Sequence, residues 1–178
     1  MELFEYEIKL YLTLLIDSNV MTINPNQNVA VITGSSSGIG LETSLTLARN
    51  GFLTYATARS LKKGAIINTL ATDKEKLPIK VLQLDVTDNQ SVNNAIQTIV
   101  SETGRIDILV NNAGYGLGGA FEDLSIEEIK NLYETNVFGL IRVTQVVLPI
   151  MRKQQSGIIV NVSSGAGLFG YPGGFSLC

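Results

Sequence analysis

Short apolar runs alternate with amphipathic helical patterns along most of this chain. Five of these runs are mostly apolar on both faces, as are strands buried inside a parallel sheet. They are Val29–Thr33, Phe52–Ala58, Lys80–Leu84, Ile106–Val110 and Ile158–Val162. The alternation predicts an α/β fold, in which a doubly wound parallel sheet is covered by helices on both sides.

Capping signals set several of the expected helix boundaries. Helical spacing follows the glycine-rich turn after the first strand and stops at Asn50 and Gly51. A weaker pattern over Leu61–Ala71 predicts a second helix. Thr87 and Gln90 match a capping box, so we expect another helix to begin there.

A long helical pattern begins at a second capping box, formed by Ser125 and Glu128, and continues to Met151. Pro149 lies inside this pattern and has no backbone N–H, so we expect it to kink the last turn. The chain shows no internal repeat, linker or low-complexity segment, which predicts one domain over residues 27–178.

Residues 1–26 precede the regular pattern as an N-terminal extension. Their apolar stretch, Leu10–Ile16, falls well short of the ~20 residues that span a bilayer. The acidic start also lacks the basic segment of a secretory signal. Three interpretations stay open: a short docked helix, a peripheral membrane anchor, which the acidic residues disfavour, and translation that begins at Met21. We favour the start at Met21.

Composition narrows the function classes. Of the 178 residues, 45% are hydrophobic and 16% charged, which excludes a disordered chain. The net charge is −3 without a basic cluster, so nucleic acid is not expected as a partner. Histidine is absent and Cys178 is the single cysteine, which excludes Ser-His-Asp and Cys-His hydrolysis and argues against a metal site. We expect no metal, no membrane partner and a cytoplasmic location.

The segment Thr33–Gly40, TGSSSGIG, joins the first strand to the first helix. A Rossmann fold places a dinucleotide pyrophosphate at this point. Glycines let the backbone approach the phosphates, and the helix N-terminus offers N–H groups and the positive end of the helix dipole. The strand–loop–helix context distinguishes the segment from an ordinary turn of Gly and Ser.

The spacing T-G-x-x-x-G-I-G resembles that of the short-chain dehydrogenases/reductases. Three further segments match the same family in the same order: Asn111–Gly114 (NNAG), Thr135–Gly139 (TNVFG) and Asn161–Ser164 (NVSS). Each segment is weak alone, but four in order form a strong match, and the match extends over residues 28–174. The resemblance implies an NAD(P)-binding Rossmann fold.

The resemblance also implies which residues contact the cofactor. Around the phosphates these are Gly34, Ser35, Ser36, Ser37, Gly38, Ile39 and Gly40. Beside the adenine and the ribose they are Asp85, Val86, Asn112, Ala113 and Gly114. An alternative role for Asp85 is that of a turn residue before a helix, and Asn111 is expected to tie adjacent strands together.

The end of the second predicted strand favours NADP(H) over NAD(H). Rossmann proteins that prefer NAD place a carboxylate there, where it bonds the ribose 2′-hydroxyl. Here Ala58 leaves space for a 2′-phosphate, and Arg59, with Lys62 or Lys63, can form charge-assisted bonds to it. The alternative is a solvated basic turn.

The family's reaction is hydride transfer between a nicotinamide and an alcohol or carbonyl carbon. Ser164 matches the family's serine that polarises the substrate oxygen, and Asn136 matches the asparagine that holds a relay water. The family's proton donor is a tyrosine in a Tyr-x-x-x-Lys motif, expected here near position 177. That motif does not occur in this sequence.

We therefore expect a short-chain dehydrogenase/reductase that is truncated before this motif, inactive as this chain, and incomplete at the C-terminal edge of its sheet. The run Ile158–Val162 is then an exposed edge strand, so poor solubility or marginal stability is expected. The alternative is a non-catalytic dinucleotide-binding module, or a partner of a full-length homologue.

The expected partners are a small-molecule alcohol or carbonyl substrate and, for the full-length parent, further copies of itself in a homo-oligomer. Leu117, Phe121, Leu168 and Phe169 hint at an apolar substrate. Core packing explains apolar residues near strand ends equally well, so the sequence leaves the substrate open.

Overall fold

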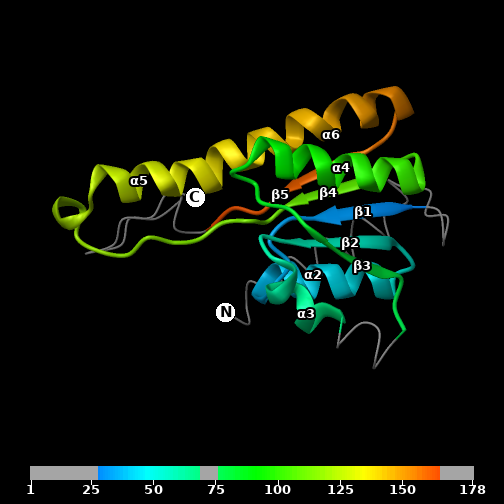
Figure 1. Cartoon of the computed structure of the whole chain (residues 1–178), viewed down its shortest axis with the longest axis horizontal. Helices are drawn as coiled ribbons and strands as arrows, with labels where there is room; N and C mark the ends of the chain where they lie inside the picture. The colour runs from blue at the N-terminus through cyan, green and yellow to red at the C-terminus, as the bar shows by residue number, and fades with distance from the viewer. Residues whose placement is uncertain (1–27, 69–75, 165–178) are drawn as a thin grey trace.

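A computed structural model of the chain describes residues 28–68 and 76–164. In this part of the chain, one parallel sheet has the strand order β3-β2-β1-β4-β5 (Figure 1). Its strands are β1 (Val29–Ile32), β2 (Leu53–Ala58), β3 (Ile79–Gln83), β4 (Ile108–Asn111) and β5 (Ile158–Asn161). The predicted α/β fold with a doubly wound sheet is confirmed.

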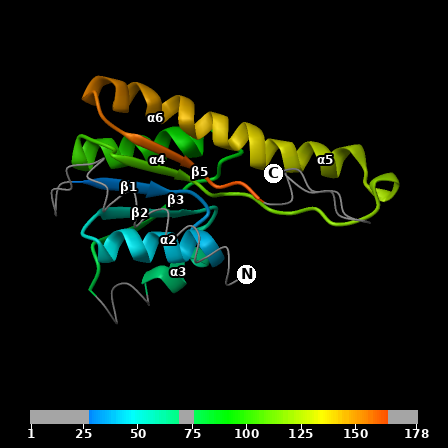
Figure 2. The same ribbon diagram turned by 180° about the vertical axis from the view of Figure 1, so that it is seen from behind.

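Helices cover both faces of the sheet, as Figures 1 and 2 show from opposite sides. On one face lie α2 (Gly38–Arg49) and α3 (Leu61–Asn68), and on the other α4 (Asn89–Thr103) and α6 (Leu140–Gln154). A long loop after β4 contains the 3-10 turn η2 (Phe121–Asp123) and leads into α5 (Ile126–Tyr133). From α5 the chain continues through the π-helical segment η3 (Glu134–Gly139) into α6, and this rod extends beyond the sheet.

Residues of β1 alternate between two hydrophobic cores. Val29 and Val31 are buried in the core that includes residues of α4 and α6. Ala30 and Ile32 are buried in the opposite core, beside Leu47 of α2. Both faces of this central strand are therefore apolar because helices bury both faces of the sheet.

The expected capping boxes have different outcomes. Ser125 and Glu128 form the predicted box at the start of α5, with the Ser125 side chain and the Glu128 side chain each bonding the other's backbone N–H. The box at Thr87 was wrong: Asp88 caps α4 by accepting the N–H of Gln90. Thr87 instead donates its hydroxyl to the carboxylate of Asp85, two residues earlier.

Other predictions fall partly or wholly outside the described residues. The end of the helix predicted over 61–71 lies outside them, as do the whole extension 1–26 and everything after Ser164.

The kink at Pro149 stays a prediction, because α6 continues through this residue to Gln154. The edge position of β5 is confirmed for the described sheet, and its residues Ile158, Ile159 and Val160 are half-buried.

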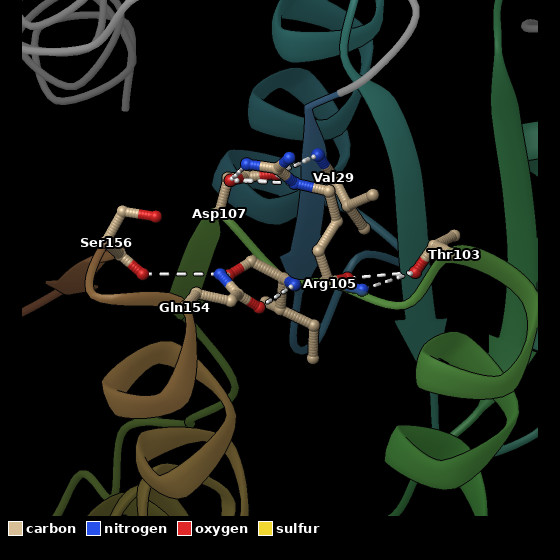
Figure 3. Close-up of polar contacts among 7 residues, drawn as sticks. Val29, Thr103, Arg105, Asp107, Gln154 and Ser156 are labelled. Atoms are coloured by element: carbon tan, nitrogen blue, oxygen red, sulfur yellow. Dashed lines mark hydrogen bonds and ion pairs between the residues drawn. The ribbon is translucent and has the colours of Figure 1, made fainter.

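The amino ends of β1 and β4 are tied together by a buried carboxylate, that of Asp107 (Figure 3). Asp107 is 1% exposed, and its Oδ2 accepts the backbone N–H of Val29 at 2.7 Å. Arg105 donates to the same carboxylate from Nε (2.9 Å to Oδ2) and from Nη2 (2.6 Å to Oδ1). Next to it, the amide of Gln154 bonds both the N–H and the carbonyl of Ile106, each at 2.9 Å, which docks the end of α6 on the segment that leads into β4.

We expect Asp107→Asn to lower the free energy of unfolding by about 1.5–3 kcal/mol, because a buried charge-assisted bond to Arg105 is lost. Urea denaturation measures this change. Asp123→Asn, at an exposed position of η2, is the matched control and should stay within about 0.5 kcal/mol of the parent. Equal stability of the two variants would contradict the role given to Asp107.

Candidate functional site

The candidate site lies at the carboxyl ends of the strands. Because β1 pairs with β2 on one side and β4 on the other, the chain reverses its direction of travel across the sheet between them. Ligands of open α/β sheets bind at such a switch point. The loops after β1 and β4 meet there, and the two predicted segments Thr33–Gly40 and Asn111–Gly114 contribute to them.

Thr33 and Asn112 lock these two loops together. The Thr33 hydroxyl oxygen accepts the backbone N–H groups of Asn112 and Ala113, both at 3.0 Å. In return, the Asn112 amide donates to the carbonyls of Thr33 (3.0 Å) and Gly34 (3.1 Å). The side chain of Asn112 thus holds the glycine loop in place, so any contact of this residue with a ligand falls to its remaining groups.

Two glycines of the loop are required by this close approach. Gly34 has φ +70°, and a Cβ there would lie 2.8 Å from Cα of Ala113. A Cβ on Gly40 would collide with the Gly34 carbonyl and with the Asn112 amide. Larger residues at either position would push the loops apart.

The start of α2 fits a bound phosphate. Ser37 is its N-cap, and no side-chain hydrogen bond from this residue caps the helix. Gly38 has φ +54°, and a Cβ on it would meet no heavy atom within 4 Å. The first turn therefore presents backbone N–H groups, including that of Ile39, at an open surface where an anion is favoured.

The three serines of the loop differ in their surroundings. Ser35 is fully buried: its hydroxyl donates to the Ile32 carbonyl (3.0 Å) and accepts from Ser44 (3.1 Å). Its N–H donates to Thr57 at 2.8 Å. Ser36 is half-buried and Ser37 exposed, so these two, rather than Ser35, have hydroxyls placed for a phosphate.

The other predicted cofactor residues follow β2 and β3 at the same edge. Arg59 is exposed directly after the buried Ala58, the last residue of β2. Asp85 is half-buried, and its Oδ1 accepts the N–H (3.0 Å) and the hydroxyl (2.8 Å) of Thr87. These bonds support the turn role of Asp85, and its contact with adenine stays a prediction.

Asn136 lies in η3 and faces the loop after β4. Its Nδ2 donates to the carbonyl of Tyr115 (2.9 Å), and its Oδ1 accepts the N–H of the same residue (3.1 Å). A Cβ on Gly114 would lie 3.2 Å from this Oδ1. The side chain therefore clamps the segment that leaves the NNAG turn, an arrangement that the helical periodicity did not reveal.

Asn111, the last residue of β4, and Ser164, which follows β5, have different surroundings. Asn111 donates from Nδ2 to Asn161 (2.9 Å) and to Thr144 (3.0 Å), which confirms the predicted tie between adjacent strands. Ser164 follows β5 and is half-buried at the end of the described residues. Leu168 and Phe169, predicted to line a substrate pocket, lie outside those residues.

Two kinds of site were not found in the described part of the chain. Residues 28–68 and 76–164 hold no group of three or more acidic or cysteine side chains suited to a metal ion. Among the helices of these residues, none has the length and apolarity needed to cross a membrane.

Comparisons with known proteins agree with this architecture. The family described as short chain dehydrogenase matches residues 28–176. An uncharacterized oxidoreductase of Bacillus subtilis, YusZ, is 44% identical over 148 residues, which are 83% of this chain and 52% of that protein. A 3-ketodihydrosphingosine reductase of Bacteroides thetaiotaomicron is 40% identical over 81% of this chain and 49% of its own length.

Among solved structures, that of ElxO with NADP bound has a TM-score of 0.76 and 36% sequence identity. The match covers 83% of this chain and 59% of that one. The chain spans about half the length of the curated relatives it matches.

We expect Gly40→Ala to lower the free energy of unfolding by about 1–3 kcal/mol, because the added methyl group has no space between the two loops. Thermal or urea unfolding measures the loss. Gly118→Ala is the control, since a Cβ there meets nothing within 4 Å. If the two variants were equally stable, the close approach at Gly40 would not be needed.

Proposed function

The chain belongs to the short-chain dehydrogenase/reductase family, and we propose that it carries the NADP(H)-binding half of an oxidoreductase acting on an alcohol or carbonyl substrate. The observation that carries the proposal is the uncapped start of α2 beside the locked loops of β1 and β4. In this proposal residues 27–178 form the Rossmann domain, residues 1–26 an extension, and the location is cytoplasmic.

The described residues would divide the binding of NADP(H) between them. Backbone N–H groups of Gly38, Ile39 and Gly40, with the hydroxyls of Ser36 and Ser37, would hold the pyrophosphate. Asp85 and Val86 would lie beside the adenine, and Ala113 and Gly114 beside the ribose. When bound, the nicotinamide would supply or accept the hydride, and these residues would hold the cofactor next to the substrate.

Preference for NADP(H) would arise at the end of β2. Ala58 offers no carboxylate to repel a 2′-phosphate, and the exposed guanidinium of Arg59 follows it directly. Lys62, exposed in the first turn of α3, adds positive charge nearby. The likeness to ElxO, whose structure has NADP bound, supports this assignment.

Ser164 and Asn136 are proposed as catalytic residues of the complete enzyme. Ser164 would bond the substrate oxygen, and Asn136 would hold a relay water while its amide fixes Tyr115. We further propose that the 178 residues alone bind dinucleotide without turnover, because no Tyr-x-x-x-Lys motif occurs in them. Exposed apolar side chains along α5, η3 and α6, such as Ile126, Phe138 and Leu148, agree with a homo-oligomer of the parent.

We expect Arg59→Glu to weaken NADPH binding by about 10- to 100-fold and to leave NADH binding within about twofold of the parent. The loss of one charge-assisted bond to the 2′-phosphate, worth about 1.5–3 kcal/mol, corresponds to a factor of this size. Fluorescence titration with both nucleotides measures the change. Arg152→Glu, exposed near the end of α6, is the charge-matched control. Tighter binding of NADH than of NADPH by the parent chain would refute the preference.

We expect no turnover of NADPH by the 178-residue chain with aldehydes, ketones or long-chain 3-oxo compounds. A positioned proton donor is worth ~10²–10⁴ in rate, and these 178 residues contain no Tyr-x-x-x-Lys motif to supply one. The measurement is NADPH absorbance with time, in samples shown by titration to bind NADPH. Turnover at ~1 per second or faster, as in ordinary enzymes, would overturn this part of the proposal. Binding without turnover is also what the alternative, a non-catalytic module, requires.

A further inference from the structure

Arg142 of α6 connects three separate segments through its guanidinium. Its Nη1 donates to the carbonyl of Val86 (2.5 Å), its Nε to Oδ1 of Asn89 (2.6 Å), and its Nη2 to Oε1 of Glu134 (2.6 Å). The side chain is only 19% exposed. All three kinds of guanidinium nitrogen are thus engaged in a fork that a lysine cannot reproduce.

The segment that Arg142 holds on one side is the loop between β3 and α4. Within this loop the Asp85 carboxylate bonds Thr87, and the Asp85 N–H donates to Ser91 at 2.9 Å. Val86 is buried against Gly139, where an added Cβ would lie 2.7 Å from the Val86 side chain. Arg142 therefore fixes the carbonyl of Val86 while Gly139 receives its side chain.

The segment that Arg142 holds on the other side is η3. Glu134 and Gly139 are its first and last residues, and Asn136 lies between them. Asn136 clamps the backbone of Tyr115, so η3 also positions the loop after β4. The loop after β3, held through Arg142, and the loop after β4, held through Asn136, are thus both anchored to the same π-helical turn.

We propose that Arg142 is a positioning residue for dinucleotide binding: it fixes the position of the Asp85–Val86 loop, on the adenine side, relative to η3 and Asn136. This inference rests on the proposed function. Its physical basis is that the Val86 carbonyl loses its charged donor when Arg142 is removed, and a loop held by fewer contacts must be ordered by the ligand at a cost in affinity.

The test compares NADPH affinity in the full 178-residue chain and in five variants of it, by fluorescence titration well below their unfolding temperatures. We expect Arg142→Met to weaken NADPH binding about 10-fold, the equivalent of about 1.4 kcal/mol. Binding of adenosine 2′,5′-bisphosphate, which has only the adenine half of the cofactor, should weaken by a similar factor. Arg142→Lys should recover only part of the affinity, because it keeps the charge without the fork.

Two controls separate positioning from general destabilisation. Asp107→Asn lowers stability at the amino ends of β1 and β4, away from the candidate site, and should leave NADPH affinity within twofold. Arg152→Met, on the exposed part of α6, should do the same. If Arg142→Met does not fold, Asn89→Ala removes the Nε contact alone and should weaken NADPH two- to threefold.

The outcomes are distinguishable. Equal NADPH affinity of the parent and a folded Arg142→Met overturns the inference alone, as does an equal loss in Asp107→Asn, which would show general softening. Parental affinity in Asn89→Ala, when Arg142→Met is unfolded, also overturns it. Failure of the parent chain to bind NADPH overturns the proposed function, and the inference with it.

Discussion

The mutual bonding of Thr33 and Asn112 is the constraint on which the candidate site depends. One threonine oxygen accepts two N–H groups from the loop after β4, and the asparagine amide bonds two carbonyls of the loop after β1. The loops can approach this closely only because Gly34 and Gly40 have no side chains. The first turn of α2 is thereby placed beside the end of β4, with its N–H groups outward, and the geometry suited to an anion follows.

The same pair of strands is also fixed at its other end. Asp107 bonds the N–H of Val29 and is neutralised by Arg105, so the amino ends of β1 and β4 are joined by a buried charge-assisted contact. Because β1 and β4 are joined at both ends, the loops that follow them have little freedom to move relative to one another. The charged contacts thus lie at the amino ends of the strands, away from the candidate site. The carboxyl ends, where the site lies, are held by neutral groups and keep open backbone N–H donors.

The sequence predicted the strands because parallel strands buried on both faces give continuous apolar runs. It predicted the family segments from their residue types and spacing. It placed Asp85, Asn112 and Asn136 at the site but could not state what their side chains bond. The capping box at Thr87 failed because the pattern of residue types is shared by neighbouring positions: Asp88 competes for the N-cap, and Asp85 engages Thr87. Ser35 matched the phosphate loop in sequence, but its hydroxyl is buried and bonded to Ile32 and Ser44. This burial depends on tertiary packing, which the sequence does not show.

The π-helical segment is the feature with the weakest signal in the sequence and the widest consequences for the site. Apolar spacing is nearly continuous from α5 to α6, so periodicity reads one helix, whereas η3 inserts a wider turn at Glu134–Gly139. Within this turn Asn136 bonds Tyr115, and Gly139 leaves room for Val86. Turns of π-helix are rare and occur mostly as single-turn bulges inside α-helices. Here Arg142, Asn136 and Gly139 hold this turn against the loops after β3 and β4, so the irregular turn and the two loops support each other.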